Sequence, residues 1–168
     1  MRKALLSFFT AALAGTALAQ QPAPPSLVRA GVTEKLTNHV WAIPDGGASL
    51  VPNVGIVVGS KAVLVIDTGM GTRNAETVLR EVAKVGAGKP IYLVTTHVHP
   101  EHDMGAHAFP KDSKLLRSKD QVEDIAAGAG MNLVPVFAQR SALNVELLQG
   151  AHHRNADVIA HPDLRKLE

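Results

Sequence analysis

The stretch TTHVHPEHDMGAH, Thr95–His107, contains four of the eight histidines of the chain and two acidic residues. His97 and His99 are two residues apart, and side chains at that spacing point to the same side of an extended chain. Pro100 favours extended backbone at His99, because proline disfavours helix in the residue before it. Both imidazoles can therefore face one cation beyond the end of a strand. Imidazole nitrogens and carboxylates are ligands that suit zinc, so this stretch predicts a metal site.

Glu101 and His102 extend the set of candidate metal ligands. If the chain stays extended, the side chain of Glu101 is on the same side as those of His97 and His99. His102 is then on the other side, and we expect it to face a neighbouring position, as in a site with two metals. Asp103 is close but out of register. The alternative is a surface loop that binds metal only adventitiously, and the acid and the further histidine argue against it. The remaining histidines are interpreted as ordinary polar residues rather than ligands: His39, His107, His152, His153 and His161.

A loop of this kind needs strands to hold it, and apolar runs precede it. Lys61–Gly69 is nearly continuous in apolar residues, which predicts a strand buried on both faces. Pro90–Thr96 is predicted as another buried strand, which leads directly into the motif. Between them, Thr72–Val85 has apolar residues at helical spacing, and glycines follow it. The candidate ligands are therefore expected at the end of a strand, where α/β folds place binding loops.

Shorter patterns surround this unit. Gly59–Ser60 is predicted as the turn of a hairpin, and Ser118 with Gln121 forms a capping-box pattern that predicts the start of a helix. Arg140–Gly150 is compatible with helix or strand. The order of elements predicts an α/β domain in which helices cover a sheet. Four further strands are predicted from apolar runs: Leu36–Pro44, Val54–Ser60, Ser113–Ser118 and Ala156–His161.

The 168-residue chain is 46% hydrophobic and 19% charged, and it contains no Cys. This composition suits one globular domain, and it excludes disulfides, thiolate catalysis and cysteine zinc sites. Without Arg2 and Lys3, the remaining 15 basic residues equal the 15 acidic ones. Because the sequence also has no basic stripe interleaved with aromatic residues, nucleic acid is not expected as a partner.

The first residues have the pattern of a secretory signal peptide. A basic start at Arg2 and Lys3 precedes a mostly apolar run that ends in Ala17-Leu18-Ala19. The run is short for a membrane span, and a buried N-terminal helix or an uncleaved anchor is the alternative. The mature protein is therefore expected to be periplasmic or secreted, without a membrane partner. The predicted divisions are a signal peptide at 1–19, a Pro-rich lead-in at 20–35 and a domain at 36–168.

LVIDTG, followed by a helix, a strand and TTHVHPEHDMG, resembles the first half of the metallo-β-lactamase fold hydrolases, in which His-x-His-x-Asp-His follows a buried strand. The resemblance implies an αββα layered sandwich that binds one or two zinc ions. His97 and His99 match the histidines of the first zinc, and His102 matches a ligand of the second. Asp67 matches an acid near the metals. We expect it to accept a hydrogen bond from a ligand imidazole or to shape the loop, the alternative being a turn-former before Gly69.

Two departures from that pattern bear on function. Glu101 replaces the usual Asp, and zinc–oxygen distances are held to about 0.2 Å. The second metal site is therefore expected to be rearranged or weakened, with Glu101 as a ligand, as a general base or in a single-metal site. The other departure is that no later His lies in the Gly-His-Thr-x-Gly turn that supplies the family's third ligand of the first zinc. Later ligands are missing, so the domain is expected to be truncated.

The resemblance implies an exported zinc-dependent hydrolase, in which a metal-bound hydroxide attacks the carbonyl of a small ester, thioester, lactone or amide. Glu101 and Asp67 are its candidate catalytic residues. The missing ligands keep two alternatives open, an inactive short form and a non-catalytic metal-binding or interaction module derived from the same fold. A cupin-type oxygenase also uses His-x-His, but the helix predicted at Thr72–Val85 argues against its all-β barrel.

Overall fold

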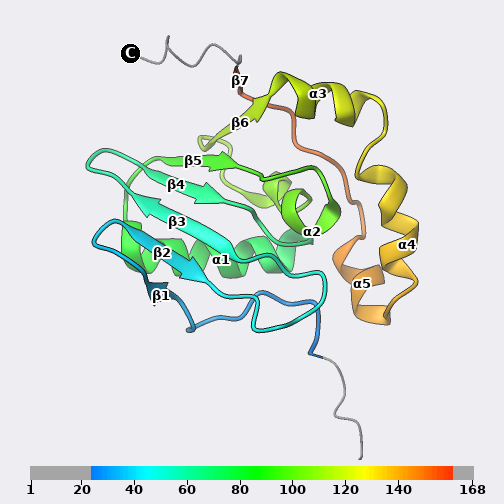
Figure 1. The fold of residues 1–168 in the computed structure, drawn as a ribbon, viewed down its shortest axis with the longest axis horizontal. Helices are drawn as coiled ribbons and strands as arrows, with labels where there is room; N and C mark the ends of the chain where they lie inside the picture. The colour runs from blue at the N-terminus through cyan, green and yellow to red at the C-terminus, as the bar shows by residue number, and fades with distance from the viewer. Residues whose placement is uncertain (1–23, 161–168) are drawn as a thin grey trace, which may run out of the picture.

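The computed structural model describes residues 24–160, which form a seven-stranded mixed sheet. The predicted signal peptide lies outside these residues. The strands lie side by side in chain order (Figure 1). Neighbours from β1 to β4 pair antiparallel, and neighbours from β4 to β7 pair parallel. The strands are β1 (Glu34–Lys35), β2 (Val40–Ile43), β3 (Val54–Val58), β4 (Val63–Ile66), β5 (Ile91–Val94), β6 (Lys114–Ser118) and β7 (Val158–Ala160).

The longest helix, α1, connects the parallel strands β4 and β5 and confirms the helix predicted at Thr72–Val85. Its apolar side is buried through Ala75, Val78 and Val82, which recur at helical spacing. The described residues also form two short 3-10 helices, η1 (Ala106–Ala108) and η2 (Met131–Leu133). The α-helices are α1 (Gly71–Gly86), α2 (Pro100–Asp103), α3 (Lys119–Ala126), α4 (Val134–Ala138) and α5 (Ala142–Leu147).

The two faces of the sheet differ in how they are covered. α1 lies behind the sheet in Figure 1, and the described helices leave the face towards the viewer open. Val65 and Leu93 belong to the buried core with α1, whereas Leu64 and Val94 are half-buried and Tyr92 is 41% exposed. The prediction that the Lys61–Gly69 strand, β4, is buried on both faces is therefore wrong, and β5, predicted as a buried strand, is buried on one face. Their burial alternates because only one face is packed.

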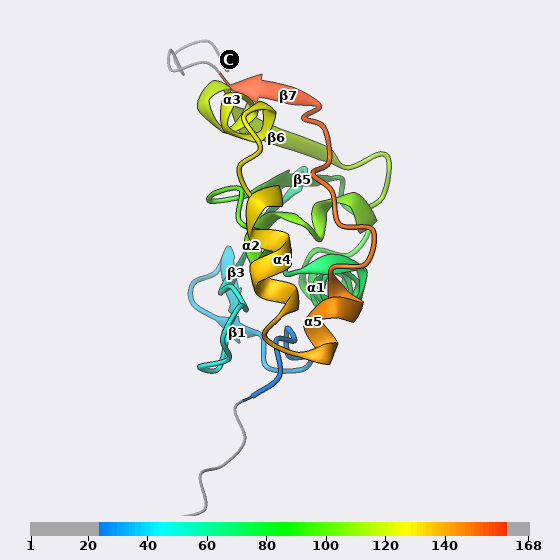
Figure 2. The same ribbon diagram turned by 90° about the vertical axis from the view of Figure 1, so that its right-hand side faces the viewer.

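A second apolar cluster lies beside the candidate ligand loop. Met104, directly after α2, is fully buried there with Met70, Phe137 and Leu147. Two of these residues come from α4 and α5, which lie at one end of the molecule (Figure 1) and side by side (Figure 2). Apolar packing therefore fixes the chain immediately after α2.

Several shorter patterns also have a clear outcome. The capping box at Ser118 and Gln121 is confirmed at the start of α3, and Arg140–Gly150 contains the helix α5. Part of the predicted lead-in packs with the domain, because Val28 is buried in the core and β1 pairs with β2. The open sheet crossed by α1 contradicts a cupin barrel. Within residues 24–160, no helix combines the length and the apolar character that a membrane span needs.

Candidate metal centre

The candidate ligand loop lies at the edge of the sheet where β4 and β5 end. Asp67 follows β4 directly, and Thr95–His99 follow β5 before α2 begins. Because β4 and β5 are parallel neighbours, the residues that follow them meet at one edge. The Asp67 N–H donates to the Val94 carbonyl at 2.9 Å, which joins the two strand ends.

Three imidazoles of the loop lie together. The ring centroid of His97 is 4.5 Å from that of His99 and 4.0 Å from that of His102. His99 has extended backbone, with ψ of 150°, as the following Pro100 predicts. The ring of His102 lies against that of His97, and the expectation that it faces a neighbouring metal stays a prediction. The structure therefore gathers all three predicted imidazoles into one group.

Glu101 lies against two of these rings. Its Oε1 atom is 3.9 Å from Nδ1 of His99 and 4.0 Å from Nε2 of His102. Its Oε2 atom is buried and has no hydrogen-bond partner in the described part of the chain. A buried carboxylate oxygen without a partner is costly, and a bound cation would satisfy it.

The position of Glu101 comes from a helix rather than from an extended chain. α2 begins at Pro100, the first helical position, where proline is favoured because its missing N–H has no partner to lose. The chain does not stay extended after His99, so the condition under which Glu101 was expected on the same side as His97 and His99 is not met. The helical turn instead places Glu101 and His102 beside the two histidines that precede it.

Asp67 contacts the ring of His102 and the backbone of the loop. Its Oδ2 atom is 2.9 Å from Nδ1 of His102, and its Oδ1 atom accepts the Thr96 N–H at 2.7 Å. Because a carboxylate accepts, His102 donates from Nδ1, and its Nε2 atom, which faces Glu101, keeps a free lone pair. The φ of Asp67 is 67°, in a left-handed region that Asp tolerates better than most residues. Asp67 thus makes both kinds of contact expected for it, while its effect on metal binding stays a prediction.

The Thr96 hydroxyl connects Asp67 to His97. Its Oγ1 atom is 3.0 Å from Oδ2 of Asp67 and 3.1 Å from Nδ1 of His97. A hydroxyl has one proton, so when it donates to the carboxylate, His97 donates from Nδ1 and its Nε2 atom is free. Burial lowers the pKa of His97 below 6.5, and the neighbouring His102 and His99 lower this pKa further. His97 is therefore neutral at pH 7, the form that binds metals.

The donor set suits zinc in chemical type and differs from a zinc site in spacing. Two donors of a tetrahedral zinc lie about 3.4 Å apart when each bond is about 2.1 Å long. The distances from Glu101 to the imidazoles of His99 and His102 exceed this by about 0.5 Å. Among residues 24–160, no three His, Asp or Glu side chains are placed to hold a metal ion as they stand. Glu101, His99 and His102 therefore fit one zinc ion only after their side chains move closer together.

Two other residues of the motif, Gly105 and His107, are not among the candidate ligands. Gly105 lies in the turn after α2 with φ of −86°, a conformation that other residues can also adopt. A Cβ atom there would lie 2.7 Å from the Gly69 carbonyl, so Gly105 is required for close approach of the backbones. His107 contacts Thr72 at 3.1 Å and lies 4.7 Å from the ring of His152, outside the group of three imidazoles.

Asp103, predicted to lie out of register, is fully buried. Its oxygens accept hydrogen bonds from Thr95, Arg117 and His153. The sequence signal for this contact was Arg117. It lies two residues after Leu115, so both side chains are on the buried side of β6, and a buried guanidinium needs a partner. The pattern did not identify that partner, and His153 was interpreted as an ordinary polar residue.

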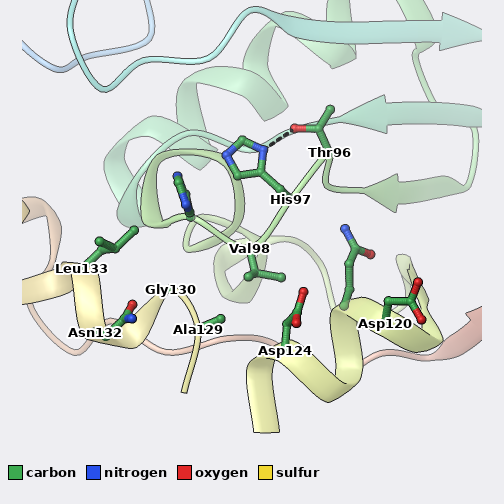
Figure 3. Close-up of a pocket in the computed structure, with 11 residues that line it drawn as sticks. Thr96, His97, Val98, Asp120, Asp124, Ala129, Gly130, Asn132 and Leu133 are labelled. Atoms are coloured by element: carbon green, nitrogen blue, oxygen red, sulfur yellow. Dashed lines mark hydrogen bonds between the residues drawn. The ribbon is translucent and has the colours of Figure 1, made fainter. Parts of the chain in front are cut away.

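A pocket of about 490 Å³ opens beside His97 and His99. Figure 3 shows the imidazole of His97 on one side of it and the carboxylates of Asp120 and Asp124, from α3, on the other. The turn at Ala129–Gly130 forms part of its wall. A small molecule in this pocket would lie next to the candidate metal ligands.

Comparisons with known proteins place the fold. Residues 49–125 match the family model described as the metallo-beta-lactamase superfamily. The FEZ-1 metallo-beta-lactamase from Legionella gormanii has a similar structure, with a TM-score of 0.56 at 12% identity over 82% of this chain and 48% of that one. The sec-alkylsulfatase Pisa1 from Pseudomonas sp. has a TM-score of 0.52 at 20% identity over 66% of this chain and 19% of that one. The sequence-derived α/β class and the family resemblance are confirmed.

One curated relative is the human protein named Acyl-coenzyme A thioesterase MBLAC2. It is 36% identical to this chain in an alignment of 67 positions that covers 35% of this chain and 24% of the relative. The chain thus spans about a quarter of that curated relative and half or less of the two solved structures.

Proposed function

Residues 49–125 carry a metallo-beta-lactamase superfamily domain, and on that premise we propose that the protein is an exported zinc-dependent hydrolase of a small ester, thioester, lactone or amide. One observation carries the proposal. The half-buried carboxylate of Glu101 has one buried oxygen, Oε2, without a hydrogen-bond partner in the described residues, and its Oε1 atom lies beside the imidazoles of His99 and His102.

The residues of the loop have distinct parts in this proposal. His97, His99, His102 and Glu101 would hold one or two zinc ions. Bound zinc lowers the pKa of water and polarises a substrate carbonyl. Asp67 is a positioning residue, because its bond to Nδ1 of His102 directs the free Nε2 atom towards Glu101. As the alternative to a ligand role, the partnerless Oε2 atom of Glu101 would act as a general base that accepts a proton.

The substrate class rests on the pocket and on the curated relative. The relative's name describes a thioesterase, which favours an acyl thioester among the four bond types. The pocket lining includes Asp120 and Asp124 and, among the described residues, no Lys or Arg. This lining disfavours anionic groups inside the pocket. We therefore propose that an uncharged acyl group enters the pocket, while an anionic leaving group stays outside it.

Export and a small-molecule partner are parts of the same proposal. Export is supported by the basic, apolar and small residues of the predicted signal at 1–19. A small-molecule substrate, rather than nucleic acid, is supported by the balanced charge of the rest of the chain.

Zinc content tests the metal assignment. Mature protein is loaded with zinc and dialysed, and bound metal is measured by mass spectrometry for the wild type and for the double variant His97→Ala/His99→Ala. The double variant is expected to lose at least about 90% of the bound zinc, because each imidazole supplies a donor that water replaces poorly. The control is His39→Ala/His152→Ala, which removes two exposed histidines outside the group. Equal zinc in the wild type and the His97/His99 variant would show that the assignment is wrong.

A non-catalytic metal-binding module is the second candidate. It is favoured by the placement of the donors, since no three of them among the described residues are ready to hold an ion. Turnover of a thioester, an ester, a lactone and a lactam at matched zinc loading separates the two candidates. Turnover that His97→Ala abolishes supports the enzyme, whereas zinc binding without turnover of any of the four supports the module.

A further inference from the structure

The carboxylate of Asp103 receives three hydrogen bonds although it is fully buried. Oδ1 accepts from the Thr95 hydroxyl at 2.9 Å and forms an ion pair with Nη1 of Arg117 at 2.7 Å. Oδ2 accepts from Nη2 of Arg117 at 3.0 Å and from Nδ1 of His153. The guanidinium of Arg117 pairs with both oxygens of Asp103, and a carboxylate in such a pair can only accept hydrogen bonds.

His153 donates hydrogen bonds from both nitrogens of its ring. Nδ1 faces the Asp103 carboxylate, and Nε2 lies 2.9 Å from the Ala129 carbonyl. Neither acceptor has a proton to give, so both protons belong to the ring. The side chain is only 5% exposed. His153 is thus a buried group with two donors that joins two segments distant in the sequence.

The second segment lies directly against the candidate ligand loop. Ala129 and Gly130 line the pocket beside His97 and His99 (Figure 3). A Cβ atom on Gly130 would lie 2.1 Å from the Val98 carbonyl and 2.7 Å from Cε1 of His153. Only glycine, which has no Cβ atom, can approach the Val98 backbone this closely, and the φ of Gly130 is +78°. His153 therefore holds the pocket wall against Val98, the residue between two candidate ligands.

We propose that His153 is a positioning residue for the candidate metal centre. Through Asp103 it holds the end of α2, which carries Glu101 and His102, and through Ala129 it holds the pocket wall beside Val98. Buried ion pairs often stabilise a fold no better than apolar side chains of similar volume, and their best-attested benefit is a defined geometry. The zinc part of this inference rests on the proposed function, whereas the ordering of the loop does not.

Two substitutions separate the two bonds of His153. The amide nitrogen of Asn lies near the position of Nδ1, and that of Gln lies near the position of Nε2. His153→Asn therefore keeps the donor to Asp103, and His153→Gln keeps only the donor to Ala129. A role in stability alone predicts similar effects from both variants. His152→Asn, a change at the exposed neighbouring histidine, is the matched control.

Amide hydrogen exchange of residues 97–104 is measured on metal-free protein, and zinc affinity is measured by titration. His153→Gln, which loses the bond to Asp103, is expected to speed exchange about tenfold at residues 101–104 and to weaken zinc binding about tenfold. His153→Asn, which loses the bond to Ala129, is expected to speed exchange about tenfold at residues 97–99 and to leave residues 101–104 within about twofold of the wild type. The control is expected to stay within about twofold at every residue, and the same pattern of exchange in the Asn and Gln variants would overturn the proposal. If the wild type binds no zinc, the proposed function fails, while the exchange measurement still tests the positioning role.

The wild type gives a second test that does not require a variant to fold. The imidazole ring of His153 is expected to show two protected N–H protons by NMR at pH 7, because both nitrogens donate to buried acceptors. A ring with a single N–H proton would overturn the proposal, since one of the two bonds would then have no donor.

Discussion

Glu101 and Asp103 lie two residues apart in α2, and their carboxylates have opposite surroundings. Both oxygens of Asp103 are filled by donors from Thr95, Arg117 and His153. Glu101 has a buried oxygen without a partner in the described residues, and its other oxygen is about 4 Å from two imidazoles. Satisfied buried carboxylates hold a structure together, whereas an unsatisfied one beside free imidazole nitrogens is placed to bind a cation. The short helix α2 therefore carries both Asp103, whose hydrogen bonds anchor the helix, and Glu101, a candidate metal ligand.

The largest effect is expected from removing the charge of the fully hydrogen-bonded carboxylate, Asp103. Asp103→Asn leaves Arg117 and His153 buried without a negative partner, which is expected to reduce the free energy of unfolding by about 3–5 kcal/mol. Chemical denaturation measures the change. Glu123→Gln, which removes the exposed partner of Lys119, is the control and is expected to cost less than about 1 kcal/mol. A loss below about 1 kcal/mol for Asp103→Asn would contradict the anchoring role.

Removing the candidate ligand Glu101 is expected to weaken zinc binding and to leave the stability of the metal-free protein nearly unchanged. Glu101→Gln keeps the shape of the side chain, so the free energy of unfolding without metal should change by less than about 1 kcal/mol. Zinc affinity should fall at least about tenfold, because a neutral amide is a poor ligand for the ion. Titration with zinc and denaturation of the metal-free protein provide the two measurements. Unchanged zinc affinity would remove Glu101 from the ligand set and leave its partnerless oxygen unexplained.

Glu81, on α1, extends the comparison to a partnered carboxylate outside the loop. Burial acts to raise its pKa, but hydrogen bonds from Lys84, Thr33 and the Gly31 N–H outweigh this and lower the pKa below 4.5. A lowered pKa in the folded protein means that Glu81 stabilises the fold above about pH 4.5. This contribution is lost as the pH falls through the lowered pKa.

Glu81→Gln should therefore be less stable than the wild type by about 1 kcal/mol at pH 7, and the difference should shrink below about pH 4.5. Denaturation at a series of pH values from 7 to 3.5 measures it. A difference that grows as the pH falls would show that the hydrogen bonds favour the protonated form.

Local patterns predicted much of the fold and of the loop. The spacing of Ala75, Val78 and Val82 predicted α1, and Ser118 with Gln121 predicted the start of α3, because these signals depend on neighbours a few residues apart. The spacing of His97 and His99 before Pro100 likewise predicted imidazoles on one side of a strand end. The errors arose where a local rule was extended too far. The run through β4 predicted burial on both faces, although α1 packs on one.

By itself, the sequence determined the strand-helix-strand unit, the position of the loop after β5 and the kinds of donor in it, since each depends on backbone geometry within a few residues. Only the tertiary structure decided which of two nearby acids is anchored and which is open. Asp103 and His153 are 50 residues apart in the chain, and no periodic pattern specifies contacts over such a separation. Their pairing arises when β6 and the segment before β7 pack beside α2, so a residue interpreted as an ordinary polar histidine becomes part of the support of the candidate metal centre.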